Sequence, residues 1–135
     1  MPIGILVVDD NDDNLRIIRE ILVARGYAVR VARDGQSALQ LIDQERPDVV
    51  LLDVMMPEMD GMEVLDRIKG SPAHAGLPVI LVTAKAQDED LLTGYKYGAD
   101  YYITKPFTAK QLLYGIGLVL GGDSPRDPVA RRDGT

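Results

Sequence analysis

The chain has 135 residues, of which 46% are hydrophobic and 27% charged, values that are ordinary for one soluble globular domain. It contains no cysteine and one histidine, which excludes disulfides, thiol chemistry and metal sites built from cysteine or several histidines. The net charge of −6 and the lack of a basic patch argue against nucleic-acid binding by its own surface, and no stretch fits a signal peptide or membrane span. We therefore expect a cytoplasmic protein.

The N-terminal part of the chain predicts a strand, a helix and a second strand. The apolar run 3–8 ends on Asp9 and Asp10, and side chains at 11–13 can cap the helix that follows. The segment 27–32 alternates apolar and polar residues, which is typical of a strand at the edge of a sheet.

The central part is organised around the segment 49–61, which reads VVLLDVMMPEMDG. A second helix precedes it, beginning near residue 35, and the apolar run 49–52 predicts a strand buried on both faces. This strand ends on Asp53, and Pro57 and Gly61 predict a shaped loop after it. The remaining predicted elements are a helix at 62–69, a strand at 78–82, a helix at 87–97, a strand at 99–104 and a helix at 108–120.

Strict alternation of strands and helices implies an α/β fold, with a doubly wound five-stranded parallel sheet and five helices. The edge-like second strand fits the flavodoxin-like order 2-1-3-4-5, although the pattern alone does not exclude other orders. The predicted domain covers residues 1–121. From 122 to 135 the composition changes to Gly, Pro, Asp and Arg, which predicts a disordered tail or the start of a linker.

Polar groups occupy the ends of four predicted strands: Asp9 and Asp10, Asp53, Thr83 and Lys105. The carboxyl ends of parallel strands share one edge of the sheet, so we expect these groups to converge there. Clustered carboxylates repel one another and require a counter-charge. Because the available ligands are oxygens, Mg²⁺ is the cation that suits them. Lys105 supplies a second cation and Thr83 a hydroxyl donor. Such a site can receive a phosphoryl group on a carboxylate.

The segments VVDDN, VVLLDVMMPEMDG, VILVTA and YYITKPF resemble, in order and spacing, the hallmark segments of receiver domains of two-component response regulators. The resemblance covers about residues 3–120. It implies a CheY-like phosphoacceptor switch that receives its phosphoryl group from a histidine kinase or a histidine phosphotransfer protein. Such a domain catalyses only its own phosphorylation and dephosphorylation, so it is not an enzyme in the usual sense.

The same resemblance implies a role for each site residue. Asp53 is expected to be the phosphorylated aspartate and a ligand of Mg²⁺ (or Mn²⁺). Asp10 is expected to bind the metal directly, Asp9 mainly through water, and Met55 through its backbone carbonyl.

Lys105 is expected to pair with the phosphoryl group, with a cis peptide bond between Lys105 and Pro106. Thr83 and Tyr102 are expected to form the switch pair that reports phosphorylation to the distal face.

Two other protein classes use comparable sites. A phosphohydrolase of the haloacid-dehalogenase-like fold needs a second acid two residues after the nucleophile, where this chain has Met55. A flavodoxin-like flavin carrier needs a phosphate-binding loop where Asp9 and Asp10 would repel the phosphate.

Simpler roles also exist for single residues: helix capping for the acidic pair, strand-end packing for Thr83, a surface position for Lys105 and core packing for Tyr102. The single histidine, His74, is expected to face solvent without a role.

The last predicted helix suggests a docking surface. Its sheet-facing stripe is expected to be Leu112, Leu113, Ile116, Val119 and Leu120. The opposite side would carry Lys110, Gln111, Tyr114, Gly115, Leu118 and Gly121. Together with Tyr97 and Tyr101, this side is expected to bind a partner or, on phosphorylation, a second copy of the chain. The alternative is a helix that frays toward the tail.

Overall fold

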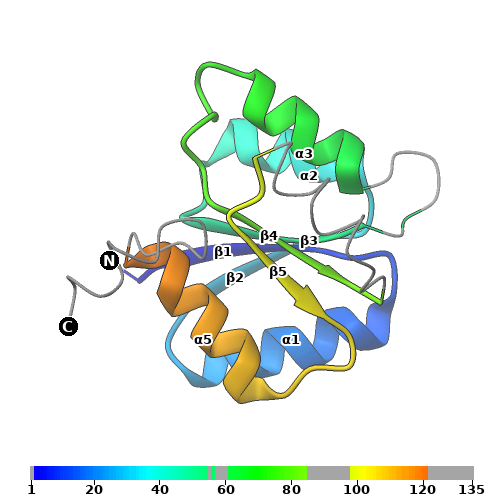
Figure 1. Ribbon diagram of the computed structural model, residues 1–135, viewed down its shortest axis with the longest axis vertical. Helices are drawn as coiled ribbons and strands as arrows, with labels where there is room; N and C mark the ends of the chain where they lie inside the picture. Colours follow the sequence, from blue (N-terminus) through cyan, green and yellow to red (C-terminus); the bar gives the residue numbers. More distant parts are fainter. Residues whose placement is uncertain (1, 55, 57–60, 85–97, 122–135) are drawn as a thin grey trace.

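The computed structural model describes residues 2–54, 56, 61–84 and 98–121. Within these residues the chain forms five strands and four helices, labelled in Figure 1. The strands are β1 (Gly4–Val8), β2 (Ala28–Ala32), β3 (Val49–Asp53), β4 (Val79–Thr83) and β5 (Tyr101–Thr104). The helices are α1 (Asp12–Ala24), α2 (Gly35–Gln44), α3 (Gly61–Gly70) and α5 (Ala109–Leu120). The helix expected at 87–97 and the tail at 122–135 lie outside the described residues.

The strands form one parallel sheet in the order β2-β1-β3-β4-β5, which confirms the predicted topology. Every residue of β3 and β4 is buried, whereas only one of the five residues of β2 is buried. The predicted edge position of the second strand is therefore correct. Helices α2 and α3 cover one face of the sheet, and α1 and α5 cover the other (Figure 1).

Each face of the sheet carries its own apolar cluster, because successive side chains of a strand point to opposite faces. On β3, Val50 and Leu52 pack beneath α2 and α3. Val49 and Leu51 pack against α1 and α5 on the other face. The central strands are thus held from both sides, which fixes the positions of the polar residues at their ends.

Three helices begin at a side-chain cap that the sequence provides. The carboxamide of Asn11 accepts a hydrogen bond from the backbone N–H of Asn14, and Asp34 caps α2 in the same way. Thr108 and Gln111 form a reciprocal capping box at the start of α5. Each such cap typically contributes about 1 kcal/mol to stability. None of the described helices is long and apolar enough to cross a membrane.

The sheet-facing stripe of α5 agrees with the prediction, and the outer side agrees except at one residue. Leu112, Ile116 and Val119 are buried, and Leu113 and Leu120 are partly buried against the same cluster. The placement of Gly115 on the outer side is wrong, because this glycine is buried. A Cβ atom at Gly115 would lie 2.8 Å from Cδ2 of Tyr101, so the tyrosine ring occupies the space of a side chain. A Cβ atom at Gly117 would meet no atom within 4 Å.

Candidate functional site

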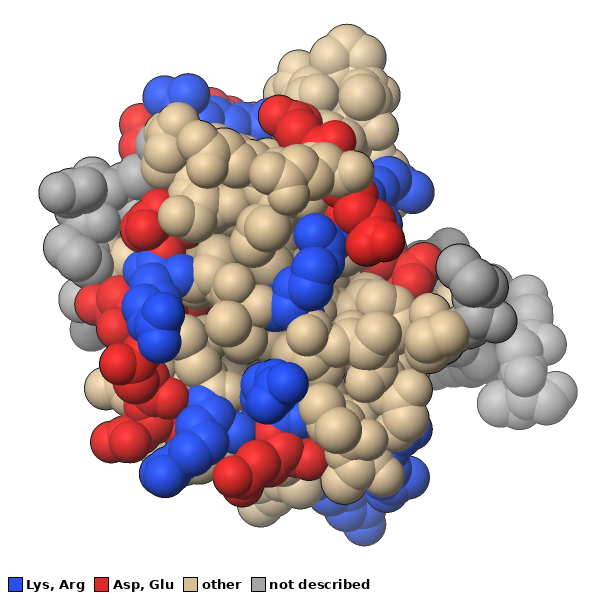
Figure 2. All heavy atoms as spheres, turned by 180° about the vertical axis from the view of Figure 1, so that it is seen from behind, with Lys and Arg blue, Asp and Glu red and all other residues tan. Residues whose placement is uncertain are grey.

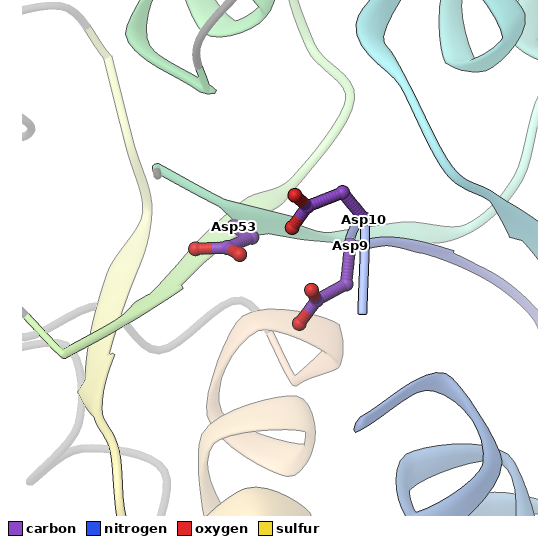
Figure 3. A group of neighbouring side chains, drawn as sticks. All are labelled: Asp9, Asp10 and Asp53. Carbon is purple, nitrogen blue, oxygen red and sulfur yellow. The ribbon is translucent and has the colours of Figure 1, made fainter. Parts of the chain in front are cut away.

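The carboxyl ends of the strands bring the acidic residues together as predicted. Asp53 is the last residue of β3, and Asp9 and Asp10 follow β1 directly. One carboxylate oxygen from each of these residues lies within 4.8 Å of the others. Figure 3 shows the carboxylates of Asp9 and Asp10 on the side where Asp53 lies, with that of Asp9 below that of Asp10 in this view. Asp9 and Asp53 are buried and Asp10 is exposed, so the cluster opens to solvent on the side of Asp10.

Lys105 supplies the counter-charge. Its Nζ lies 2.9 Å from Oδ2 of Asp9 and 3.6 Å from Oδ2 of Asp53, and its side chain is 20% exposed. The alternative of a solvated surface lysine is therefore wrong. The backbone N–H of Lys105 donates to the carbonyl of Thr83 at 2.8 Å, and the peptide bond to Pro106 is cis, as the resemblance implied. The end of β5 is thus attached to the end of β4.

The carboxylate of Asp9 accepts hydrogen bonds from residues at the start of α1 as well as from Lys105. Its Oδ1 accepts the backbone N–H of Asn11 at 2.9 Å, and its Oδ2 accepts Nδ2 of Asn14 at 3.3 Å. The start of α1 therefore holds this carboxylate in place, and the positive end of the helix dipole stabilises its charge. The role of Asn14 was not predicted from the sequence, because its contact with Asp9 depends on the position of α1 relative to the end of β1.

The donor set fits a divalent cation of the Mg²⁺ type. Hard cations bind oxygen ligands, and Mg²⁺ usually takes one or two carboxylates and keeps several waters. Asp10 is exposed and its carboxylate lies beside that of the buried Asp53, whereas the contacts of Asp9 with Lys105 and Asn14 leave it less suited to direct coordination. Met55, the expected source of a carbonyl ligand, lies outside the described residues.

Gly61 allows α3 to begin directly against the site. Its backbone N–H donates to the carbonyl of Val54 at 3.0 Å. A Cβ atom at this position would overlap the carbonyl oxygen of Asp53 and lie 2.6 Å from Cα of Val54. Any larger residue would push the helix away from the strand end. The sequence marked Gly61 only as a loop residue, because this close approach depends on tertiary packing.

Thr83 and Tyr102 lie on the same face of the sheet. In the register of β4 and β5, Tyr102 pairs with Leu81 and Thr104 pairs with Thr83, so the side chains of all four point to the α2 and α3 side. Thr83 is fully buried, and Tyr102 is only 8% exposed and packs in the apolar cluster beneath these helices. In this structure Tyr102 already occupies an inward position.

The residues expected to form a docking surface are partly brought together. A hollow of about 290 Å³ is lined by Tyr101, Gln111 and Tyr114, among others from β5 and α5. Tyr114 is 54% exposed, and Leu118 is half-buried. Tyr97 lies outside the described residues.

His74 does not have the exposed position that the sequence suggested. Its side chain is only 16% exposed, and its Nε2 lies 3.0 Å from Oδ1 of Asp43 in the last turn of α2. The prediction was wrong because the loop after α3 folds back toward α2, a long-range contact that local composition does not encode.

Comparison with known proteins identifies relatives of the whole described fold. The family profile of the response regulator receiver domain matches residues 5–116. The response regulator MprA of Mycolicibacterium vanbaalenii is 40% identical over 127 residues, covering 94% of this chain and 54% of the relative. The probable transcriptional regulatory protein TcrX of Mycobacterium tuberculosis is 39% identical over 119 residues, covering 88% of this chain and 50% of the relative. The chain thus spans about half the length of these curated relatives.

Solved structures show the same similarity. A putative response regulator from Chloroflexus aurantiacus superposes with a TM-score of 0.86 at 33% identity, covering 90% of this chain and 99% of that one. The chemotaxis protein CheY4 of Vibrio cholerae superposes with a TM-score of 0.85 at 30% identity, covering 89% of this chain and 100% of that one.

Proposed function

Because the chain belongs to the family of response regulator receiver domains of two-component systems, we propose that Asp53 is its phosphoacceptor. One observation supports this choice above the others. The carboxylate of Asp53 ends the central strand β3, is 5% exposed, and has Lys105 Nζ at 3.6 Å and two further carboxylates within 4.8 Å. A nucleophile that must meet a phosphoryl group needs cationic groups of this kind beside it.

The proposed reaction is a direct transfer from a phosphohistidine. An oxygen of Asp53 forms the new P–O bond while the P–N bond of the donor breaks, and the product is an acyl phosphate. Asp10 and Asp53, with the carbonyl of Met55, would hold Mg²⁺ (or Mn²⁺), and Asp9 would contribute through water. When bound, the ion supplies positive charge against the phosphoryl oxygens.

Lys105 would then change partners. In the structure it pairs with Asp9 and Asp53, and the phosphoryl group would offer it new oxygens within the same region. The cis peptide bond and the backbone contact with Thr83 hold the lysine at this edge of the sheet.

Thr83 and Tyr102 would report the modification. Their shared face on β4 and β5 supports this role. Thr83 lies at the end of β4, and Tyr102 on β5 pairs with Leu81, two residues before Thr83. The readout would be a change of contacts on the side of β5 and α5, where Tyr101, Gln111, Tyr114 and Leu118 would meet a partner or a second copy.

The donor would be a histidine kinase or a histidine phosphotransfer protein, as in the family. Direct nucleic-acid contact is not part of the proposal. On the face in Figure 2, the coloured basic and acidic side chains are interspersed, and the described residues there form no continuous basic patch.

The test is phosphorylation by a small donor such as acetyl phosphate, followed by intact mass. Wild type should gain one phosphoryl group in the presence of Mg²⁺, and EDTA should block the gain. Asp53→Asn should gain none, while Asp66→Asn, which removes an exposed carboxylate on α3, should behave as wild type. Equal phosphorylation of Asp53→Asn and wild type would show that another residue is the acceptor.

A further inference from the structure

A neutral amide, that of Asn14, contacts the charged cluster at the strand ends. Asp9 is only 2% exposed, and the structure gives its carboxylate three hydrogen-bond donors. Its Oδ1 accepts the backbone N–H of Asn11 at 2.9 Å. Its Oδ2 accepts two side-chain donors, Nζ of Lys105 at 2.9 Å and Nδ2 of Asn14 at 3.3 Å. One oxygen of Asp9 is therefore shared by a cation and a neutral amide.

The two donors on this oxygen differ in their freedom to move. Nζ of Lys105 ends a long, flexible side chain and lies 2.9 Å from Asp9 and 3.6 Å from Asp53. Nδ2 of Asn14 ends a short side chain in the first turn of α1. The backbone N–H of Asn14 donates to Oδ1 of Asn11 at 2.9 Å, which fixes the base of that side chain. The ammonium can thus turn from Asp9 toward Asp53 while the amide stays beside Asp9.

The chemistry of the pair sets the direction of the amide. A carboxylate only accepts hydrogen bonds, so the NH₂ group of Asn14 and not its oxygen must face Asp9. If Lys105 leaves Oδ2 of Asp9, that buried oxygen loses its cationic donor, and a buried acceptor without a donor is unfavourable. Asn14 supplies a second donor that is already in place at 3.3 Å. Its presence therefore makes the departure of Lys105 less unfavourable.

From these contacts we propose that Asn14 is a positioning residue for the phosphorylation of Asp53. Its amide keeps Oδ2 of Asp9 hydrogen-bonded when the ammonium of Lys105 turns to the phosphoryl group. Asn14 contacts neither the phosphoryl group nor the metal in this scheme, and it acts through Asp9 and Lys105. The inference rests on the proposed function, because Lys105 changes partners only if Asp53 carries a phosphoryl group.

The test compares two ligands on wild type and Asn14→Leu, a variant of similar size that has no donor. The ligands are Mg²⁺ alone and the phosphoryl mimic beryllofluoride at saturating Mg²⁺, each titrated against backbone amide NMR signals. With Mg²⁺ alone Lys105 remains on Asp9, so the affinity for Mg²⁺ should equal that of wild type. Beryllofluoride should bind Asn14→Leu about tenfold more weakly, as expected for the loss of one hydrogen bond to a charged group.

Two further variants control for folding and for the change of side chain. Asn14→Ala also lacks the donor and adds no bulk, so it should weaken beryllofluoride binding in the same direction even if Asn14→Leu does not fold. Gln40→Leu makes the same amide-to-leucine change at an exposed position of α2, on the other face of the sheet (Figure 1), and should bind both ligands as wild type does.

The outcomes separate this inference from the proposed function. Wild-type affinity for beryllofluoride in the Asn14 variants would overturn the inference alone. A parallel loss of Mg²⁺ and beryllofluoride affinity would also overturn it, because a merely structural role of Asn14 would disturb both ligands through Asp9. If wild type itself does not bind beryllofluoride, the proposed function is wrong and the inference falls with it.

Discussion

Two glycines of α5 test the packing of the β5 and α5 side, because the same substitution should have opposite effects on stability. Replacing a helical glycine with alanine stabilises a helix by about 1 kcal/mol. At Gly117 a Cβ atom would meet nothing within 4 Å, so Gly117→Ala should gain this amount. At Gly115 a Cβ atom would lie 2.8 Å from Cδ2 of Tyr101 and 3.1 Å from Cδ1 of Ile103. Overpacking of this kind typically costs about 1–3 kcal/mol.

The helix gain is common to both variants, so the difference between them measures the packing cost of Tyr101. We expect Gly115→Ala to be less stable than Gly117→Ala by about 1–3 kcal/mol, or roughly 3–9 °C in melting temperature for a chain of this size. Urea unfolding of wild type and both variants measures it, and Gly115→Ala combined with Tyr101→Leu should recover much of the loss. Equal stabilisation by the two alanines would refute the placement of the tyrosine ring on α5.

Three further predictions concern the site and its readout. Mg²⁺ should raise the melting temperature, because it binds the folded state. Asp10→Asn should weaken this response and should stabilise the metal-free protein, because one repelling charge is removed. A Mg²⁺ titration of Asp10→Asn that equals that of wild type would contradict the ligand assignment. Beryllofluoride, a phosphoryl mimic, should shift the NMR signals of Tyr102 as well as those of the strand ends, and shifts confined to the strand ends would remove Tyr102 from the switch. If a second copy docks on α5, light scattering should show a beryllofluoride-dependent dimer for wild type and a monomer for Leu118→Arg, whereas a wild-type monomer in both states would exclude the dimer.

The parallel sheet and the converging site residues could be predicted from the sequence because both follow from local patterns and one geometric rule, whereas the order 2-1-3-4-5 was one of several that the pattern allowed. Apolar runs of strand length, each ended by a polar residue, identify β1, β3 and β4. Parallel pairing then places Asp9, Asp53 and Thr83 along one edge without any knowledge of side-chain contacts. The partly exposed β2 was recognisable at the edge because its residues alternate.

What the sequence did not predict depends on contacts between distant segments. Gly115 was placed on the outer side of α5 because its position around the helix is intermediate, and only the ring of Tyr101 decides its burial. His74 was placed in solvent because its loop is rich in small and polar residues, and only the return of that loop to Asp43 brings it inside. The contact of Gly61 with the backbone of Asp53 is of the same kind.

The charges at the strand ends connect metal binding, phosphorylation and the position of Lys105. When Asp9, Asp10 and Asp53 are all ionised, the ammonium of Lys105 leaves an excess of two negative charges, which is the charge of one Mg²⁺. Binding of one Mg²⁺ would therefore neutralise the excess negative charge of these side chains. A phosphoryl group on Asp53 adds negative charge beside the same ammonium, which now lies 2.9 Å from Asp9 and 3.6 Å from Asp53. In the proposed reaction Lys105 would then divide its contacts among more oxygens than before, directly after β5, the strand that carries Tyr101 and Tyr102.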